Sequence, residues 1–322
     1  MTPEAVLVYS GSGLNRLSQT YHELFRTRLA KGWWRDRERP VLINNWEATG
    51  FDFDEKKILQ LASIAKELGM EMFVLDDGWF GKRNNDKAGL GDWFVNREKI
   101  PDGIDGLSEK IEEMGLKFGL WFEPEMVNED SNFYRAHPGW VLSTPGRARS
   151  VGRNQYVLDF SNKDVVQAVY EMMASVLRGA RISYVKWDMN RKITECFSNG
   201  GKTAQGEVFH RYILGVYSLY GQLTREFPHV LFEGCASGGG RFDPGLLAFA
   251  PQSWTSDNTD AGDRLKIQYG TSLVYPLSCI GCHVSAVPNQ QIGRMTPLST
   301  RANAAFFGSF GYELDLNKLT ES

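Results

Sequence analysis

The segment S-Y-V-K-W-D at Ser183–Asp188 is a short apolar run, rich in residues that favour β-structure, and it ends in a carboxylate. The chain repeats one pattern in which such a run is followed by polar residues and glycine and then by a segment of helical periodicity. The other seven runs are Val41–Trp46, Met72–Asp77, Lys117–Phe122, His229–Glu233, Ser253–Asp257, Ile280–Ser285 and Tyr312–Leu316. Strands that alternate with helices predict a parallel sheet, and eight such units predict an α/β fold of the (β/α)8 or TIM-barrel type.

The segments between the runs carry helix start and stop signals. Asp54 is expected to cap a helix that has one apolar stripe and ends at Gly69. Ser161 and Asp164 have the spacing of a capping box at the start of another helix. These signals support the alternation of strands and helices, and we assign them no chemistry.

The two ends of the chain are less regular. Residues 1–40 hold no predicted barrel strand, and we interpret them as an entry helix and linker before a barrel at residues 41–322. Only six residues follow the predicted eighth strand, so the sequence leaves open whether the eighth βα unit is complete. We expect either the entry helix or nothing to cover the position of the eighth outer helix.

The composition excludes several classes of protein. The chain has 42% hydrophobic and 23% charged residues and a formal net charge of −3, which are globular values that argue against a nucleic-acid partner. No apolar run is long enough to span a bilayer, and the N-terminus lacks the pattern of a secretory signal, so we expect no membrane partner. Four cysteines are few for 322 residues and predict reduced thiols in the cytoplasm.

The pair Cys279 and Cys282 forms one C-x-x-C motif. A single motif of this kind is weak evidence for zinc or redox chemistry, because a zinc site needs a second pair of ligands at close spacing. We therefore interpret these residues as ordinary barrel cysteines and expect no metal and no organic cofactor.

Acidic residues recur where the predicted strands end. The strand ends contain N-N-W-E at residues 44–47, D-D-G-W at 76–79, W-F-E-P-E at 121–125, K-W-D at 186–188, E-G-C at 233–235 and S-D-N-T-D at 256–260. In barrel enzymes the active site lies at this edge, and a buried carboxylate without a partner costs several kcal/mol. One such acid is ordinarily a cap or an ion pair, but many at one edge predict a functional site.

Two features of these strand ends point to sugar chemistry. Lys186 and Asp188 alternate to the same side of their strand, so the ammonium group is expected to keep the carboxylate ionised, as a nucleophile requires. The chain also contains nine Trp, whose flat faces can cover the apolar face of a sugar. Paired carboxylates and aromatic walls predict glycoside hydrolysis, although Asp76-Asp77-Gly78 alone would be an ordinary turn.

Five motifs, in this order, resemble those of the glycoside hydrolase family 36 α-galactosidases. They are L-D-D-G-W-F at Leu75–Phe80, L-W-F-E-P-E-M at Leu120–Met126, Y-V-K-W-D-M-N-R at Tyr184–Arg191, F-E-G-C-A-S-G-G-G-R at Phe232–Arg241 and W-T-S-D-N-T-D-A at Trp254–Ala261. The resemblance implies a retaining enzyme that removes terminal α-galactosyl residues from oligosaccharides such as melibiose and raffinose. Full-length members of the family also have a large N-terminal β-sandwich and a C-terminal β-domain.

The resemblance also implies roles for single residues. Asp188 corresponds to the nucleophile and Asp257 to the acid/base. The residues expected to bind the sugar are Trp46, Asp76, Asp77, Trp121, Arg153, Lys186, Cys235, Ser237 and Gly238. Three of these residues, Cys235, Ser237 and Gly238, form a loop that is expected to accept the axial O4 of galactose.

Several alternatives remain open at this point. A galactosyl transferase would share every catalytic residue, and an α-N-acetylgalactosaminidase would need more room at C2 of the sugar. A barrel that lacks the flanking domains could also bind sugar and be poorly active. The expected partner is a small-molecule galactoside, and a homo-oligomer is left open.

Overall fold

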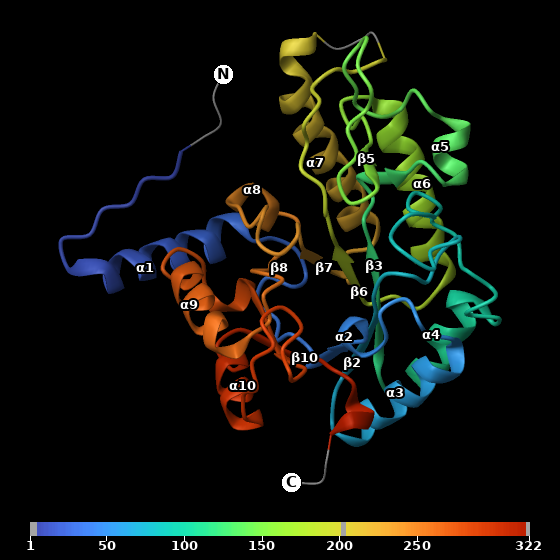
Figure 1. Cartoon of the computed structure of the whole chain (residues 1–322). Helices are drawn as coiled ribbons and strands as arrows, with labels where there is room; N and C mark the ends of the chain where they lie inside the picture. Colours follow the sequence, from blue (N-terminus) through green and yellow to red (C-terminus); the bar gives the residue numbers. More distant parts are fainter. Residues whose placement is uncertain (1–4, 201–203, 320–322) are drawn as a thin grey trace.

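Eight parallel strands close into a barrel in the computed structural model, which describes residues 5–200 and 204–319 (Figure 1). The strand order around the barrel is β1-β10-β9-β8-β7-β6-β3-β2. The bounds are β1 Leu42–Asn44, β2 Met72–Leu75, β3 Lys117–Phe122, β6 Tyr184–Trp187, β7 Leu231–Gly234, β8 Gln252–Trp254, β9 Ile280–Ser285 and β10 Ser309–Glu313. The (β/α)8 fold that the sequence predicts is confirmed.

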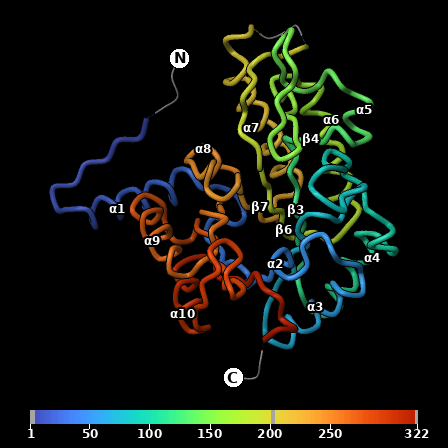
Figure 2. The backbone as a smooth tube through the Cα atoms, in the orientation of Figure 1, coloured from blue at the N-terminus to red at the C-terminus, as the bar shows by residue number. Residues whose placement is uncertain are grey.

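Helices surround this barrel, as the tube in Figure 2 shows. They are α1 Gly13–Leu24, α2 Trp46–Thr49, α3 Glu55–Glu67, α4 Gly103–Glu113, α5 Asn132–Ala136, α6 Lys163–Gly179, α7 Val208–Glu226, α8 Pro244–Leu247, α9 Ala261–Ser272 and α10 Leu298–Ala305. A π-helical turn η1 at Phe25–Leu29 continues α1, and three short 3-10 turns are η2 Gln205–Glu207, η3 Leu277–Cys279 and η4 Leu316–Lys318. The strands β4 Met126–Asn128 and β5 Gln155–Val157 form a separate antiparallel pair.

The helix caps agree with the sequence at one site and differ at another. The Asp54 side chain accepts a hydrogen bond from the backbone N–H of Lys57 at 2.8 Å and caps α3, as predicted. The capping box at Ser161 is wrong, because Asn162 is the residue that caps α6. The Ser161 hydroxyl instead donates to Asp159 at 2.5 Å, so a nearby buried acceptor has taken the group that would have capped the helix.

The eighth barrel strand begins three residues earlier than predicted, at Ser309 instead of Tyr312. The residues at its start, S-F-G, do not have the composition of a buried strand. Gly311 is required there because a Cβ atom would lie 2.8 Å from Cδ2 of His283 on the neighbouring strand. The correction places Glu313 at the carboxyl end of β10, where the site-forming residues of the other strands lie.

Of the two arrangements expected for the position of the eighth outer helix, the one in which the entry helix covers it is not seen. α1 and its extension lie beside α8 and α9 (Figure 1), where Phe25 stacks on Tyr275 with ring centroids 5.4 Å apart. The turn η4 follows β10 instead and contacts α3, with a hydrogen bond of 3.2 Å between Gln60 and Asn317.

The linker after the entry helix closes the amino-terminal end of the barrel. Trp34 is buried in a cluster with residues from the lower parts of four strands, and its indole N–H donates to the backbone oxygen of His229 at 2.9 Å. The other members of the cluster are Leu42, Met72, Val74, Tyr184 and Leu231. One end of the barrel is therefore packed with side chains, and the opposite end is left for a site. In the part of the chain that the structure describes, no helix is long and apolar enough to cross a membrane.

Replacement of Trp34, which is buried at the amino-terminal end of the barrel, should destabilise the protein. We expect Trp34→Ala to lower the free energy of unfolding by about 3–5 kcal/mol, because it empties a buried site that cannot collapse. Trp33→Ala is the matched control, since Trp33 is 45% exposed and should cost about 0.5 kcal/mol or less. Urea denaturation measures both, and equal losses would show that Trp34 does not plug the barrel.

Candidate active site

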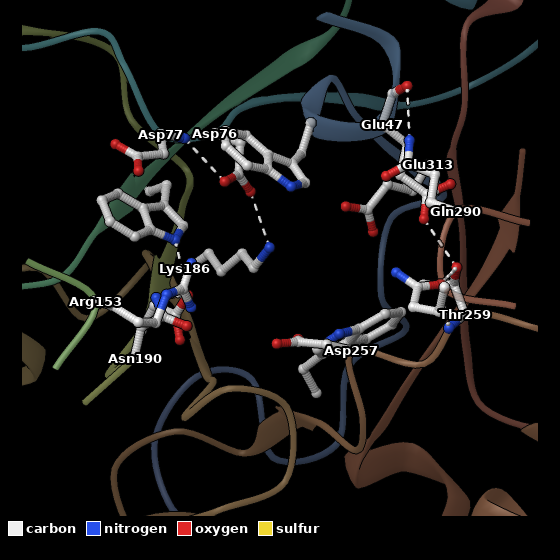
Figure 3. A pocket seen from close by; sticks show the side chains of 15 residues that line it. Glu47, Asp76, Asp77, Arg153, Lys186, Asn190, Asp257, Thr259, Gln290 and Glu313 are labelled. Atoms are coloured by element: carbon white, nitrogen blue, oxygen red, sulfur yellow. Dashed lines mark hydrogen bonds and ion pairs between the residues drawn. The ribbon is translucent and has the colours of Figure 1, made fainter. Parts of the chain in front are cut away.

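A cavity of about 210 Å³ opens at the carboxyl ends of the barrel strands (Figure 3). Most of its lining residues are polar or aromatic, and they come from strand ends and from the loops that follow. They are Trp46, Glu47, Asp76, Asp77, Trp121, Arg153, Lys186, Asp188, Asn190, Trp254, Asp257, Thr259, Gln290, Gln291 and Glu313. The barrel therefore brings together residues that are up to 267 positions apart, from Trp46 to Glu313.

Eight of the eleven residues that the sequence singles out line this cavity. They are Trp46, Asp76, Asp77, Trp121, Arg153, Lys186, Asp188 and Asp257. The other three, Cys235, Ser237 and Gly238, are not among the residues that line it, and their contact with the sugar stays a prediction. Their loop lies beside the cavity, where the backbone N–H of Ser237 approaches Asp188 Oδ1 at 3.4 Å.

Asp188 lies directly after β6 and is surrounded by hydrogen-bond donors. Its Oδ2 accepts from the indole N–H of Trp121 at 3.2 Å and from the amide of Asn190 at 2.7 Å. Its Oδ1 accepts from the backbone N–H groups of Met189 at 2.8 Å and Ser237 at 3.4 Å. Donors on both oxygens stabilise the ionised carboxylate, which is the form that can act as a nucleophile.

Lys186 makes its direct ion pair with a different acid from the one expected. Its Nζ lies 2.8 Å from Oδ2 of Asp76, and the Asn44 amide donates to the same oxygen at 2.5 Å. Burial lowers the pKa of Lys186, but Asp76 and the more distant carboxylates outweigh burial and hold the pKa well above its usual range. Lys186 is therefore charged, and it acts on Asp188 as a nearby positive charge and not as a hydrogen-bond partner.

Asp77 is held by an arginine that the sequence did not single out. Arg83 donates to both oxygens of Asp77, with its Nε at 2.9 Å from Oδ1 and its Nη2 at 2.8 Å from Oδ2. Both side chains are almost fully buried. Burial raises the pKa of Asp77 more than Arg83 lowers it, so this carboxylate depends on its arginine partner.

Asp257 follows β8 and faces the cavity from the side opposite Asp76 (Figure 3). Its side chain is accessible from the cavity, but the surrounding walls displace much of the bulk water. This desolvation is the main cause that raises the pKa of Asp257 from its ordinary 3.8 to about 6, and the charge of Asp188 adds to it. An aspartic acid with this pKa can hold a proton and give it to a leaving group.

Two glutamates on the remaining wall were not assigned a role from the sequence. Glu47 accepts from the Thr259 hydroxyl at 2.8 Å and from the Ala286 N–H at 3.0 Å, and burial followed by the charge of Glu313 raises its pKa to about 7. Glu313 lies 3.1 Å from His283 Nδ1. Glu47 could have been found, since it directly follows the first run. Glu313 could not, because the predicted eighth strand began at Tyr312 and placed Glu313 near its start instead of at its carboxyl end.

The C-x-x-C pair, Cys279 and Cys282, is not among the residues that line the cavity. All four are free thiols, and burial raises the pKa of both Cys279 and Cys282 to about 11. Among residues 5–200 and 204–319, no group of three or more His, Cys, Asp or Glu side chains has an arrangement that could hold a metal ion.

Comparisons with known proteins show which family the chain belongs to. The family model described as melibiase matches residues 1–322. Alpha-galactosidase AgaA of Geobacillus stearothermophilus is 61% identical over 100% of this chain and 44% of its own length, and Alpha-galactosidase Mel36A of Lactobacillus acidophilus is 51% identical over 99% and 44%. A crystal structure of an AgaA variant in complex with raffinose matches with a TM-score of 0.96 and 60% identity, over 98% of this chain and 44% of that one. The chain thus spans less than half the length of these relatives.

Removal of Arg83 should destabilise the protein, because Asp77 would lose its ion-pair partner. We expect Arg83→Met to lower the free energy of unfolding at pH 7 by about 3–5 kcal/mol, because it leaves a buried carboxylate unpaired. The loss should shrink as the pH falls toward the raised pKa of Asp77, where the group takes up a proton. Urea denaturation at pH 7 and pH 5 measures this.

The matched control for that experiment is Arg211→Met, which breaks an exposed ion pair with Glu207 on the outside of the barrel. An exposed pair at this spacing contributes about 0.3–0.5 kcal/mol. A similar small, pH-independent loss in both variants would show that Arg83 does not compensate Asp77.

Proposed function

The chain belongs to the melibiase family, and from this premise we propose that it is the catalytic barrel of a retaining α-galactosidase. The proposed substrates are oligosaccharides with a terminal α-galactosyl residue, such as melibiose and raffinose. A relative with 60% identity binds raffinose in its crystal structure, which supports this substrate class.

The observation that carries the proposal is the contrast between two carboxyl groups in one cavity. Four donors stabilise Asp188 as an anion, whereas burial and the charge of Asp188 raise the pKa of Asp257 to about 6. A retaining glycosidase needs one ionised carboxylate as nucleophile and one protonated carboxyl group as acid. We assign the first role to Asp188 and the second to Asp257.

The reaction proceeds in two displacements. An oxygen of Asp188 attacks the anomeric carbon while Asp257 gives its proton to the departing glycosidic oxygen, which leaves a covalent β-galactosyl–enzyme. Asp257, now ionised, then takes a proton from a water molecule that attacks the same carbon and releases Asp188. Each displacement inverts the anomeric carbon, so the product keeps the α configuration. This route requires a separation of about 5–5.5 Å between the two carboxyl groups.

The remaining cavity residues suit the recognition of a hexose. Asp76 and Asp77 offer acceptors for sugar hydroxyls, and Lys186, ion-paired with Asp76, offers a donor beside them. Trp46 and Trp121 provide flat apolar surfaces for the C–H face of the ring. Arg153 remains a proposed contact at the sugar edge, and the loop with Cys235, Ser237 and Gly238 remains a proposed contact for the axial O4 of galactose.

Azide should distinguish the two acids by the product that it forms. In Asp188→Ala, turnover of a nitrophenyl α-galactoside should be lost, and azide should restore it by direct attack to give β-galactosyl azide. In Asp257→Ala, the covalent intermediate still forms from this activated substrate, and azide should then give α-galactosyl azide. Proton NMR of the products separates the two anomers.

The parent chain is the control for this experiment. It should hydrolyse the nitrophenyl α-galactoside with release of α-galactose. If galactose binds to the parent chain in a thermal-shift assay without any turnover, the chain is a silent barrel and the proposed function is wrong. If both variants give the same azide anomer, the assignment of the two roles is wrong.

A further inference from the structure

Glu125 is a fully buried carboxylate that lies outside the cavity and is not used in the proposed reaction. Four side-chain donors surround it. Arg241 donates through Nη1 to Oε2 at 2.8 Å and through Nη2 to Oε1 at 2.6 Å. The indole N–H of Trp187 donates to Oε1 at 2.9 Å, and the hydroxyl of Tyr212 donates to Oε2 at 2.6 Å. Each oxygen of Glu125 therefore accepts two hydrogen bonds.

Two of these donor side chains, Trp187 and Arg241, come from segments next to the proposed catalytic acids, and Tyr212 comes from α7. Trp187 is the last residue of β6 and directly precedes Asp188. Arg241 ends the loop of residues 235–241, which follows β7. At its other end this loop is bonded to β6, because the backbone N–H of Cys235 donates to the backbone oxygen of Trp187 at 2.7 Å. Glu125 thus joins the end of β6 to the far end of the 235–241 loop.

The 235–241 loop in turn contacts both proposed catalytic acids. The backbone N–H of Ser237 approaches Asp188 Oδ1 at 3.4 Å. Gly238 forms a β-bridge with Ser256, and a Cβ atom at position 238 would lie 2.7 Å from the backbone nitrogen of Asp257. Gly238 also has a φ of +84°, which a larger residue would adopt only with strain. The loop therefore fits tightly between the backbone of Asp257 and the side chain of Asp188.

An ion pair at this depth is costly to form and is weak evidence for stability, because well-packed apolar residues often stabilise a core as much. The two parallel hydrogen bonds of this pair, by contrast, fix the orientation and the distance of Arg241 relative to Glu125. Burial lowers the pKa of Arg241, but Glu125 outweighs burial and raises it, so the guanidinium stays charged. The pair is thus suited to holding two segments in one arrangement.

We propose that the Glu125–Arg241 pair is a positioning device that fixes the 235–241 loop against the end of β6 and thereby sets the placement of Asp188 relative to Asp257. The inference rests on the proposed function, since it concerns the same two acids. Neither residue lines the cavity, and the proposed sugar-binding residues Asp76, Asp77 and Lys186 lie on other segments.

The test is the kinetics of Glu125→Gln, which keeps the shape of the side chain and removes its charge. We expect kcat for a nitrophenyl α-galactoside to fall by about 100-fold, the effect of a small misplacement of reacting groups. Binding of galactose, measured by calorimetry, should change little. The high-pH limb of kcat/KM should move to lower pH, because a displaced loop lets water reach Asp257, whose raised pKa comes mainly from burial.

Two further variants separate positioning from loss of folding. Arg241→Lys keeps the charge and loses the bidentate geometry, so it should fold and show the same changes in kcat and in the pH limb. In the double variant E125Q/R241K, the loss should be no larger than in the more damaged single variant, because the pair acts as one unit.

The matched control is Glu55→Gln, since Glu55 is another buried carboxylate, paired with Lys110 at 2.6 Å on the outside of the barrel. It should lower stability and leave kcat and the pH limb unchanged.

The outcomes are distinguishable. Folded Glu125→Gln and Arg241→Lys proteins with the parent's kcat and pH limb would overturn the positioning role alone. Equal effects of Glu55→Gln would do the same, because they would show a general response to destabilisation. A parent chain that does not hydrolyse the substrate would overturn the proposed function and this inference with it.

Discussion

The burial of several carboxylates in one cavity is the constraint on which the site depends. Six acidic side chains line one cavity, against two cationic ones, Arg153 and Lys186. The protein gives four of these acids their own partners: Asp76 pairs with Lys186, Asp77 with Arg83, Glu313 with His283, and Asp188 with four hydrogen-bond donors. Among the described residues, no cationic side chain lies within ion-pair distance of Asp257 or Glu47, and burial is the main cause that raises their pKa values to about 6 and about 7. The difference between nucleophile and acid thus follows from how the cavity distributes its cations and donors.

The barrel provides the frame for this distribution. Its amino-terminal end is packed around Trp34, so the strands are fixed there and their carboxyl ends are left to carry the polar groups. Partners then come from segments that are remote in sequence, such as Arg83 from the loop after β2 and His283 from β9. A closed barrel achieves this because every strand end lies on the same rim.

Much of the fold and part of the site could be predicted from the sequence. Seven of the eight strands lie within or close to their predicted runs, because each run is apolar and bounded by turn residues. The eighth was misplaced because Gly311, which close packing against His283 requires, hides the start of the strand. Within the site, the residues at strand ends could be named, since their position follows from the strand itself.

The partners of those residues could not be predicted in the same way. Lys186 shares a strand face with Asp188, yet its ion pair is with Asp76 from another strand, and such a choice depends on the closed barrel. The cap of α6 moved to Asn162 for a similar reason, since a buried acceptor took the Ser161 hydroxyl. The link between the 235–241 loop and Glu125 could not be predicted either, because it joins Arg241 to a residue 116 positions earlier in the chain.

The most direct test of this account is the pH dependence of kcat/KM for an α-galactoside. The pKa of Asp257 is raised from 3.8 to about 6, so the group holds its proton below pH 6 and loses it as the pH rises through that value. The account predicts that kcat/KM falls above about pH 6, and that Asp257→Asn, assayed with an activated nitrophenyl substrate, no longer shows this limb. A parent profile that stays flat to pH 8, or a limb that persists in Asp257→Asn, would contradict it.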